Sequence, residues 1–100
     1  MSQDQNDIYL DGKVMARPML TKLEGQTMFV FELKTTTPRQ TVQHRILCPS
    51  DLAEKADSLR AGTRVIVQGE VVMVLAHLEG ESGMANGVMV PAILARSITA

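Results

Sequence analysis

Aromatic residues are scarce in this sequence of 100 residues, which has no tryptophan, one tyrosine and two phenylalanines. Because aromatic side chains supply much of the buried area in most cores, the core here has to be built from aliphatic residues and seven methionines. Cysteine is as scarce, since Cys48 is the single thiol. One thiol excludes an internal disulfide and favours a reducing compartment.

Long hydrophobic runs are also missing. No apolar stretch approaches the roughly 20 residues of a membrane-spanning helix, and the polar start, MSQDQND, lacks the pattern of a secretory signal. We therefore expect a cytoplasmic protein with no membrane partner. Residues 1–7 are expected to be disordered, and residues 8–100 to form a single domain.

The chain has little net charge. Its formal charge is −1, so no global basic field indicates a polyanion partner. The charge is uneven, however, because residues 12–49 hold six Lys or Arg and two Glu, a local excess of four positive charges. Ordinary solvated side chains also explain such an excess. The excess therefore indicates a nucleic-acid partner only if the fold brings these residues together.

Motifs for catalysis or metal binding are missing as well: there is no carboxylate pair, nucleophile with a base, or phosphate-binding glycine loop. Cys48 has no second cysteine or histidine at a ligand spacing, so zinc is not expected. In the alternating pattern of its strand, His44 falls on the same apolar face as Ile46 and Cys48. It is therefore expected in the core or at an interface. We expect neither an enzyme nor a cofactor.

Alternating apolar and polar residues predict five β-strands. They cover residues 8–16, 27–34, 41–48, 63–75 and 88–98, with a turn at residues 21–26. A helical stripe from Leu52 to Leu59 predicts one short helix between the third and fourth strands. Gly12 and Gly69 lie within strands and would allow strong coiling. This order predicts an all-β, five-stranded OB-fold barrel.

The segment QHRILCPSDLAEKADSLRAGTRVIVQGEV, residues 43–71, resembles the middle of bacterial single-stranded-DNA-binding proteins. The features that carry the resemblance are His44-Arg45-Ile46, Leu52-Ala53-Glu54, Gly62-Thr63-Arg64-Val65 and Gln68-Gly69. NDIYLDGKVMARP and GQTMFVFELK are similar to the first two strands of that family. The resemblance covers residues 6–98 and implies the same OB fold.

The resemblance leaves the subfamily open. GTRVIVQG, residues 62–69, is equally similar to the tailless primosomal replication protein N family. The chain stops at Ala100, where the single-stranded-DNA-binding family usually continues into an acidic tail. Gln43 and Pro49 also stand where that family often has aromatic residues.

Two functions follow from the residues and the resemblance. The first is non-sequence-specific binding of single-stranded DNA in replication, recombination or repair, through a basic groove. Its contacts are expected from outward-facing and loop residues: Tyr9, Lys13, Arg17, Lys22, Lys34, Arg39, Gln43 and Arg45. Tyr9 is the one good candidate for base stacking, because Phe29 and Phe31 share the core-facing alternation of their strand. The alternative is an OB-fold protein-interaction or assembly module, of a primosome or secretion type, with little or no nucleic-acid binding.

Self-association is expected as well. Met28 and Val30 lie on the outward alternation of their strand, and exposed apolar residues indicate a partner surface. The resemblance implies that Gly12 and His44 lie near a subunit contact. We therefore expect a homodimer or homotetramer with these four residues at the interface, and other replication or recombination proteins as further partners.

Overall fold

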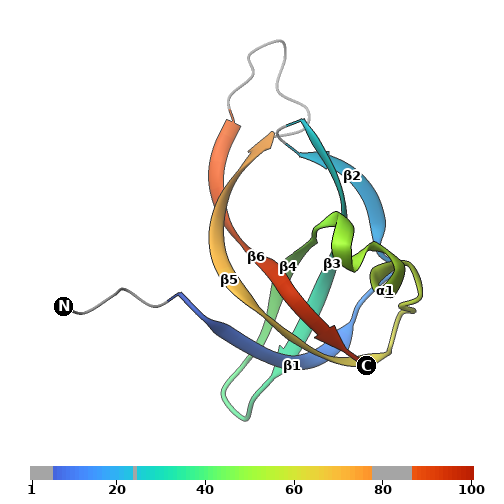
Figure 1. The fold of residues 1–100 in the computed structure, drawn as a ribbon. Helices are drawn as coiled ribbons and strands as arrows, with labels where there is room; N and C mark the ends of the chain where they lie inside the picture. The colour runs from blue at the N-terminus through green and yellow to red at the C-terminus, as the bar shows by residue number, and fades with distance from the viewer. Residues whose placement is uncertain (1–5, 24, 78–86) are drawn as a thin grey trace, which may run out of the picture.

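The computed structural model describes residues 6–23, 25–77 and 87–100 (Figure 1). These residues form six strands and one short helical segment. The strands are β1 (Ile8–Val14), β2 (Met19–Leu23), β3 (Gln26–Thr36), β4 (Thr41–Cys48), β5 (Arg64–His77) and β6 (Gly87–Thr99). A 3₁₀ turn, Ser50–Leu52, runs into helix α1 (Ala53–Asp57) between β4 and β5. No helix in the described ranges is long and apolar enough to cross a membrane.

The strands close into a barrel. β5 pairs with β1 on one side and with β6 on the other, β6 meets β4 in a short parallel contact, and β4 pairs with β3. Pairing of β3 with Lys13 and Val14 of β1 closes the ring, and β2 forms a hairpin beside β3. Figure 1 shows the strands curving around a common centre. The all-β OB-fold barrel expected from the sequence is confirmed.

Two elements differ in detail from the sequence-based expectation. Met19–Leu23 forms a strand where a turn was expected over residues 21–26, so the turn shrinks to the connection around Gly25. The strand was missed because Met19 and Leu20 are both apolar and both exposed, which hides any alternation. The helix is shorter than expected, because Leu52 belongs to a 3₁₀ turn and α1 ends at Asp57.

The core is aliphatic, as the composition predicts. Its larger cluster joins β1, β3, β4, β5 and β6 with the helical segment. Phe31 and Leu33 are buried in it, as the alternation of their strand predicts, and Phe29 packs against it half-buried. A smaller cluster around Leu47 and Val74 lies between β4 and the β5–β6 hairpin.

Asn6 and Asp7, which precede β1, are attached to the barrel by side-chain hydrogen bonds and an ion pair. Of residues 1–7, for which disorder was expected, Asn6 and Asp7 are described, and residues 1–5 lie outside the described residues. The Asn6 side chain donates from Nδ2 to the Val71 carbonyl oxygen over 2.7 Å and accepts from the Val71 N–H over 2.9 Å. The Asp7 carboxylate pairs with Arg96. The two hydrogen bonds of the Asn6 side chain thus extend the contact between the chain start and β5 beyond Ile8, where the β1–β5 backbone pairing ends.

Two strands approach a neighbour so closely that only glycine fits. A Cβ atom at Gly12 would overlap the carbonyl oxygen of Lys34, where β1 crosses β3. A Cβ atom at Gly69 would overlap the carbonyl oxygen of Leu94, at a bulge where the register of β5 against β6 shifts. These close approaches allow β1 and β5 to curve around the barrel.

Replacing Gly69 by alanine should destabilise the barrel by about 3 kcal/mol, because the added methyl group meets backbone atoms of β6. Gln68→Ala, at the neighbouring exposed position, should cost less than about 0.5 kcal/mol. Urea unfolding followed by circular dichroism compares both variants with the unaltered protein. Equal midpoints for Gly69→Ala and Gln68→Ala would contradict this account of the bulge.

Cys48 is fully buried in the larger cluster. Burial raises the pKa of its thiol from 9.0 to about 12, because the thiolate would lose its hydration. The folded state therefore holds the proton more tightly than the unfolded state. Its contribution to stability is complete below pH 9.0 and is lost as the pH rises from there towards about 12.

The stability advantage of the unaltered protein over Cys48→Ala should therefore shrink as the pH rises. Urea unfolding at about pH 8 and about pH 11 measures the free energy of unfolding of both proteins. The variant serves as the control for lysine and tyrosine titration, which both proteins share. A difference that stays constant across this range would show that the thiol ionises equally in both states.

Candidate nucleic-acid interface

Four positions on neighbouring strands line up in a row on the outside of the barrel. Arg64 of β5 pairs with Lys13 of β1, and Lys13 pairs in turn with Lys34 of β3. Lys34 pairs with Gln43 of β4. All four side chains are exposed, because they alternate with residues such as Val14 that point into the core. We call Arg64, Lys13, Lys34 and Gln43 the basic row.

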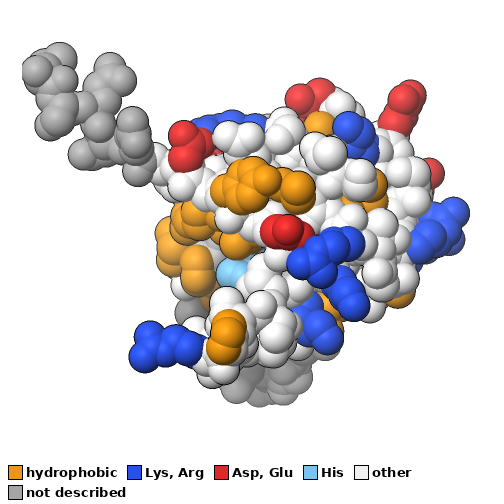
Figure 2. All heavy atoms as spheres, turned by 90° about the horizontal axis from the view of Figure 1, so that it is seen from below, with side chains coloured by type: hydrophobic (Ala, Val, Ile, Leu, Met, Phe, Trp, Pro, Cys, Tyr) orange, Lys and Arg blue, Asp and Glu red, His pale blue; other side chains and the backbone are white. Residues whose placement is uncertain are grey.

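The basic row borders a cleft of about 240 Å³. The residues that line the cleft are Asp11, Gly12, Lys13, Lys34, Thr36 and Arg64. Figure 2, which views the molecule from below, shows Lys and Arg side chains gathered beside an acidic side chain. Arg64 was not among the expected contact residues, because only its register with Lys13 brings it to this surface.

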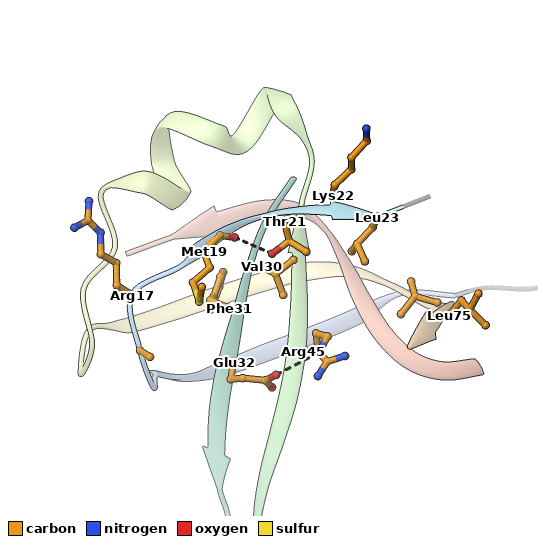
Figure 3. A pocket seen from close by; sticks show the side chains of 12 residues that line it. Arg17, Met19, Thr21, Lys22, Leu23, Val30, Phe31, Glu32, Arg45 and Leu75 are labelled. Atoms are coloured by element: carbon orange, nitrogen blue, oxygen red, sulfur yellow. Dashed lines mark hydrogen bonds and ion pairs between the residues drawn. The ribbon is translucent and has the colours of Figure 1, made fainter. Parts of the chain in front are cut away.

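A larger groove of about 650 Å³ lies between β2, β3 and β5 (Figure 3). Its apolar lining residues are Ala16, Met19, Leu23, Val30, Phe31, Val74 and Leu75, and its polar ones are Arg17, Thr21, Lys22, Glu32 and Arg45. In Figure 3, Glu32 and Arg45 lie together, whereas Lys22 points away from the other lining side chains. Glu32 and Lys34 are two residues apart on β3 and face the same side, so the groove and the basic row lie next to each other on the outer face of this strand.

The arginines of this surface are paired with carboxylates. Three ion pairs join them: Arg45 Nε to Glu32 Oε1 at 3.3 Å, Arg64 Nε to Asp11 Oδ1 at 3.0 Å, and Arg17 Nη2 to Asp57 Oδ1 at 4.0 Å. Each pair is more than a third exposed, so it is worth at most about 1 kcal/mol and can exchange its carboxylate for another anion. Among the described residues, no carboxylate lies within 4.0 Å of Lys13, Lys22 or Lys34. Within the described part of the chain, these lysines are thus the lining or row cations without an ion pair.

Six of the eight expected contact residues are brought together: Lys13, Arg17, Lys22, Lys34, Gln43 and Arg45 line the groove or belong to the basic row. Tyr9 and Arg39 do not line either depression. Tyr9 is 66% exposed on β1, in register with Gln68 of β5. Arg39 is exposed in the loop between β3 and β4. The one aromatic candidate for base stacking therefore lies outside the groove.

The four residues expected at a subunit interface are spread over the barrel. Gly12 is buried at the β1–β3 crossing, and the half-buried His44 has its Nε2 atom 2.9 Å from Thr35 Oγ1. Met28 and Val30 are half-buried against the smaller core cluster. Among the residues that the structure describes, the exposed large apolar side chains besides Tyr9 are Met15, Met19, Leu20, Met73, Leu75 and Met89. The interface residues remain a prediction.

Metal binding has no candidate among the side chains that the structure describes. No group of three or more His, Cys, Asp or Glu residues in the described ranges could hold a metal ion. Cys48 is enclosed by the core, and His44 makes its hydrogen bond to a threonine hydroxyl.

Solved structures share this fold, although no family model and no curated protein sequence matches the chain. An SSB of Plasmodium falciparum, in a complex with ssDNA, matches with a TM-score of 0.68 and 24% identity, over 94% of this chain and 89% of that chain. The mitochondrial single-stranded DNA-binding protein Rim1 of S. cerevisiae matches with a TM-score of 0.72 and 10% identity, over 97% of this chain and 95% of that chain. The resemblance to SSB proteins is thus confirmed at the level of the fold.

Proposed function

We propose that this protein binds single-stranded DNA without sequence preference, as a non-enzymatic protein of DNA replication, recombination or repair. The proposal is carried by the position of the groove next to the basic row on the outer face of β3. Single-stranded nucleic acid needs a track of this kind, in which exposed cations follow the phosphates and a depression accepts the bases. The solved complex of the Plasmodium protein with ssDNA supports the same class of ligand for this barrel.

Binding to this surface is mainly electrostatic. Lys13 and Lys34 stand side by side and have no carboxylate partner among the described residues. Arg45 and Arg64 become available when a phosphate replaces the carboxylate that each now holds. Neutralised phosphates release their counterions, so the affinity falls steeply as salt is added.

Fluorescence anisotropy with a labelled oligo(dT) of roughly 30 nucleotides tests the proposal, and we expect binding at about 50 mM salt that weakens as salt rises. Lys34→Ala should weaken binding and reduce the salt slope by about one unit, because one phosphate contact is lost. Lys55→Ala removes an exposed lysine of α1, outside the groove and the basic row, and should change neither quantity.

Two outcomes would contradict the proposal. No binding at about 50 mM salt would overturn it and favour a protein-interaction or assembly module instead. Equal effects of Lys34→Ala and Lys55→Ala would show that DNA does not follow the basic row.

We further propose that the protein self-associates through the open edge of β1. β1 pairs with β5 over Ile8–Lys13, but with β3 only at Lys13 and Val14. Within the described residues, the edge of β1 that faces away from β5 has no neighbouring strand over residues 8–12. An unpaired edge is a template for a strand of another chain, and two copies of β1 can pair around a two-fold axis.

The hydrogen bonds of β1 show which groups point to this edge. Val14 donates to Thr63 over 2.9 Å and accepts from Gly62 over 2.7 Å, both on the β5 side. Backbone groups alternate sides along a strand, so the N–H groups of Tyr9 and Asp11 point to the open edge. These two donors are available to a second chain.

Tyr9→Pro should convert the oligomer into a monomer, because it removes an outward N–H and leaves the β5 ladder in place. Tyr9→Ala keeps that N–H and should remain oligomeric. Light scattering after size-exclusion chromatography should give the unaltered protein a mass of two or four times the chain mass of 10.9 kDa. A mass of 10.9 kDa that persists at high concentration would overturn the proposal.

We also propose the cytoplasm as the site of action and other replication or recombination proteins as partners. The single cysteine supports a reducing compartment. Met73 and Met89, exposed on the β5–β6 hairpin, offer an apolar surface to such a partner.

A further inference from the structure

The floor of the groove is apolar and open to solvent. Met19 is 70% exposed and Leu75 42% exposed, although both line the groove. Leu23 and Val30 line it as well and are half-buried. Figure 3 shows Met19 near Phe31 and Val30, with Leu75 towards the opposite end. Apolar side chains that stay in water in this way mark binding surfaces.

The rim of the same groove is cationic. Arg17, Lys22 and Arg45 line it, and Glu32 is the one carboxylate among the lining residues, while Arg17 also pairs with Asp57 outside the groove. An occupant that fits both features carries negative charges along one side and uncharged, apolar faces along the other. Single-stranded nucleic acid has this pattern, with phosphates on one side and bases on the other. The groove volume of about 650 Å³ also lies within the roughly 300–1,000 Å³ of sites that enclose small organic groups.

We propose that the groove is a base-binding site in which Met19 and Leu75 pack against the faces of unpaired bases. This inference rests on the proposed function and adds a contact that the cations do not supply. The thioether of methionine is polarisable and adaptable and makes favourable contacts with aromatic rings. Phe31, the aromatic residue among the lining side chains, is only 3% exposed, so Met19 takes the place of an exposed aromatic platform. The packing carries no sequence preference, because every base has such a face.

Contacts to bases and contacts to phosphates differ in their response to salt. Losing a phosphate contact reduces the number of counterions released, so the slope of affinity against salt changes. Losing a base contact weakens binding by the same factor at every salt concentration and leaves the slope unchanged. Salt titration of matched variants thus separates the two kinds of contact.

Met19→Ala and Leu20→Ala form the matched pair. Leu20 is the next residue of β2 and is 63% exposed, but it faces the other side of the strand and does not line the groove. Met19→Ala should weaken binding of oligo(dT) roughly two- to tenfold with an unchanged salt slope. Leu20→Ala should bind as the unaltered protein does. An abasic oligomer of the same length should bind equally to all three proteins.

Two further variants extend the test. Leu75→Ala removes apolar surface from the other end of the groove and should repeat the pattern of Met19→Ala. Met19→Phe supplies a flat face at the same position and should bind oligo(dT) at least as tightly as the unaltered protein. Thermal unfolding of each variant checks that the barrel is intact, as expected because none of these side chains belongs to the buried core.

The outcomes separate this inference from the proposed function. If Met19→Ala loses affinity equally for oligo(dT) and for the abasic oligomer, Met19 shapes the groove without touching bases, and the inference is overturned. Unchanged oligo(dT) binding by both Met19→Ala and Leu75→Ala overturns it as well. In these cases the proposed function still stands. Failure of the unaltered protein to bind oligo(dT) overturns both.

Discussion

The crossing of β1 over β3 is the contact on which the barrel and its surface depend. At Gly12 the two backbones come so close that a side chain has no room, and the pairing of Lys13 and Val14 with β3 closes the ring. Without closure, β1 would be a sheet edge along its whole length, and Lys13 would not stand beside Lys34. One glycine therefore permits both the curvature of the barrel and the alignment of its charges.

Like charges opposite each other in a sheet repel, and nearby carboxylates reduce this repulsion on the surface that holds the basic row. Lys13 and Lys34 are direct neighbours across β1 and β3, which is a repulsive arrangement. Asp11 and Glu32 lie on the same surface and pair with arginines, so negative charge stands close to the lysines. A bound polyanion would relieve the remaining repulsion. Because it would bind the folded chain and not the unfolded one, it would also stabilise the barrel.

Much of the fold could be predicted because its signals are local. The alternation of β3 predicts that Phe31 and Leu33 are buried, and the glycine at position 69 predicts the bend of β5. β2 could not be predicted, because Met19 and Leu20 are exposed on opposite faces and show no polar–apolar pattern. Its existence depends on pairing with β3 across the turn at Gly25, which the residues of β2 by themselves do not indicate.

The sequence by itself determined the alternation of β1, β3 and β4, because alternation is a property of a few neighbouring residues, but Met28 and Val30 of the outward set are half-buried against the smaller core cluster. Lys34 and Gln43 are exposed, as that alternation predicts. Only the tertiary structure decided which outward residues meet, because this depends on strand register and on where the ring closes. Register brought Arg64 into the basic row and left Tyr9 outside the groove. The β2–β3 hairpin placed Met19 on the groove floor, which no local pattern could have shown.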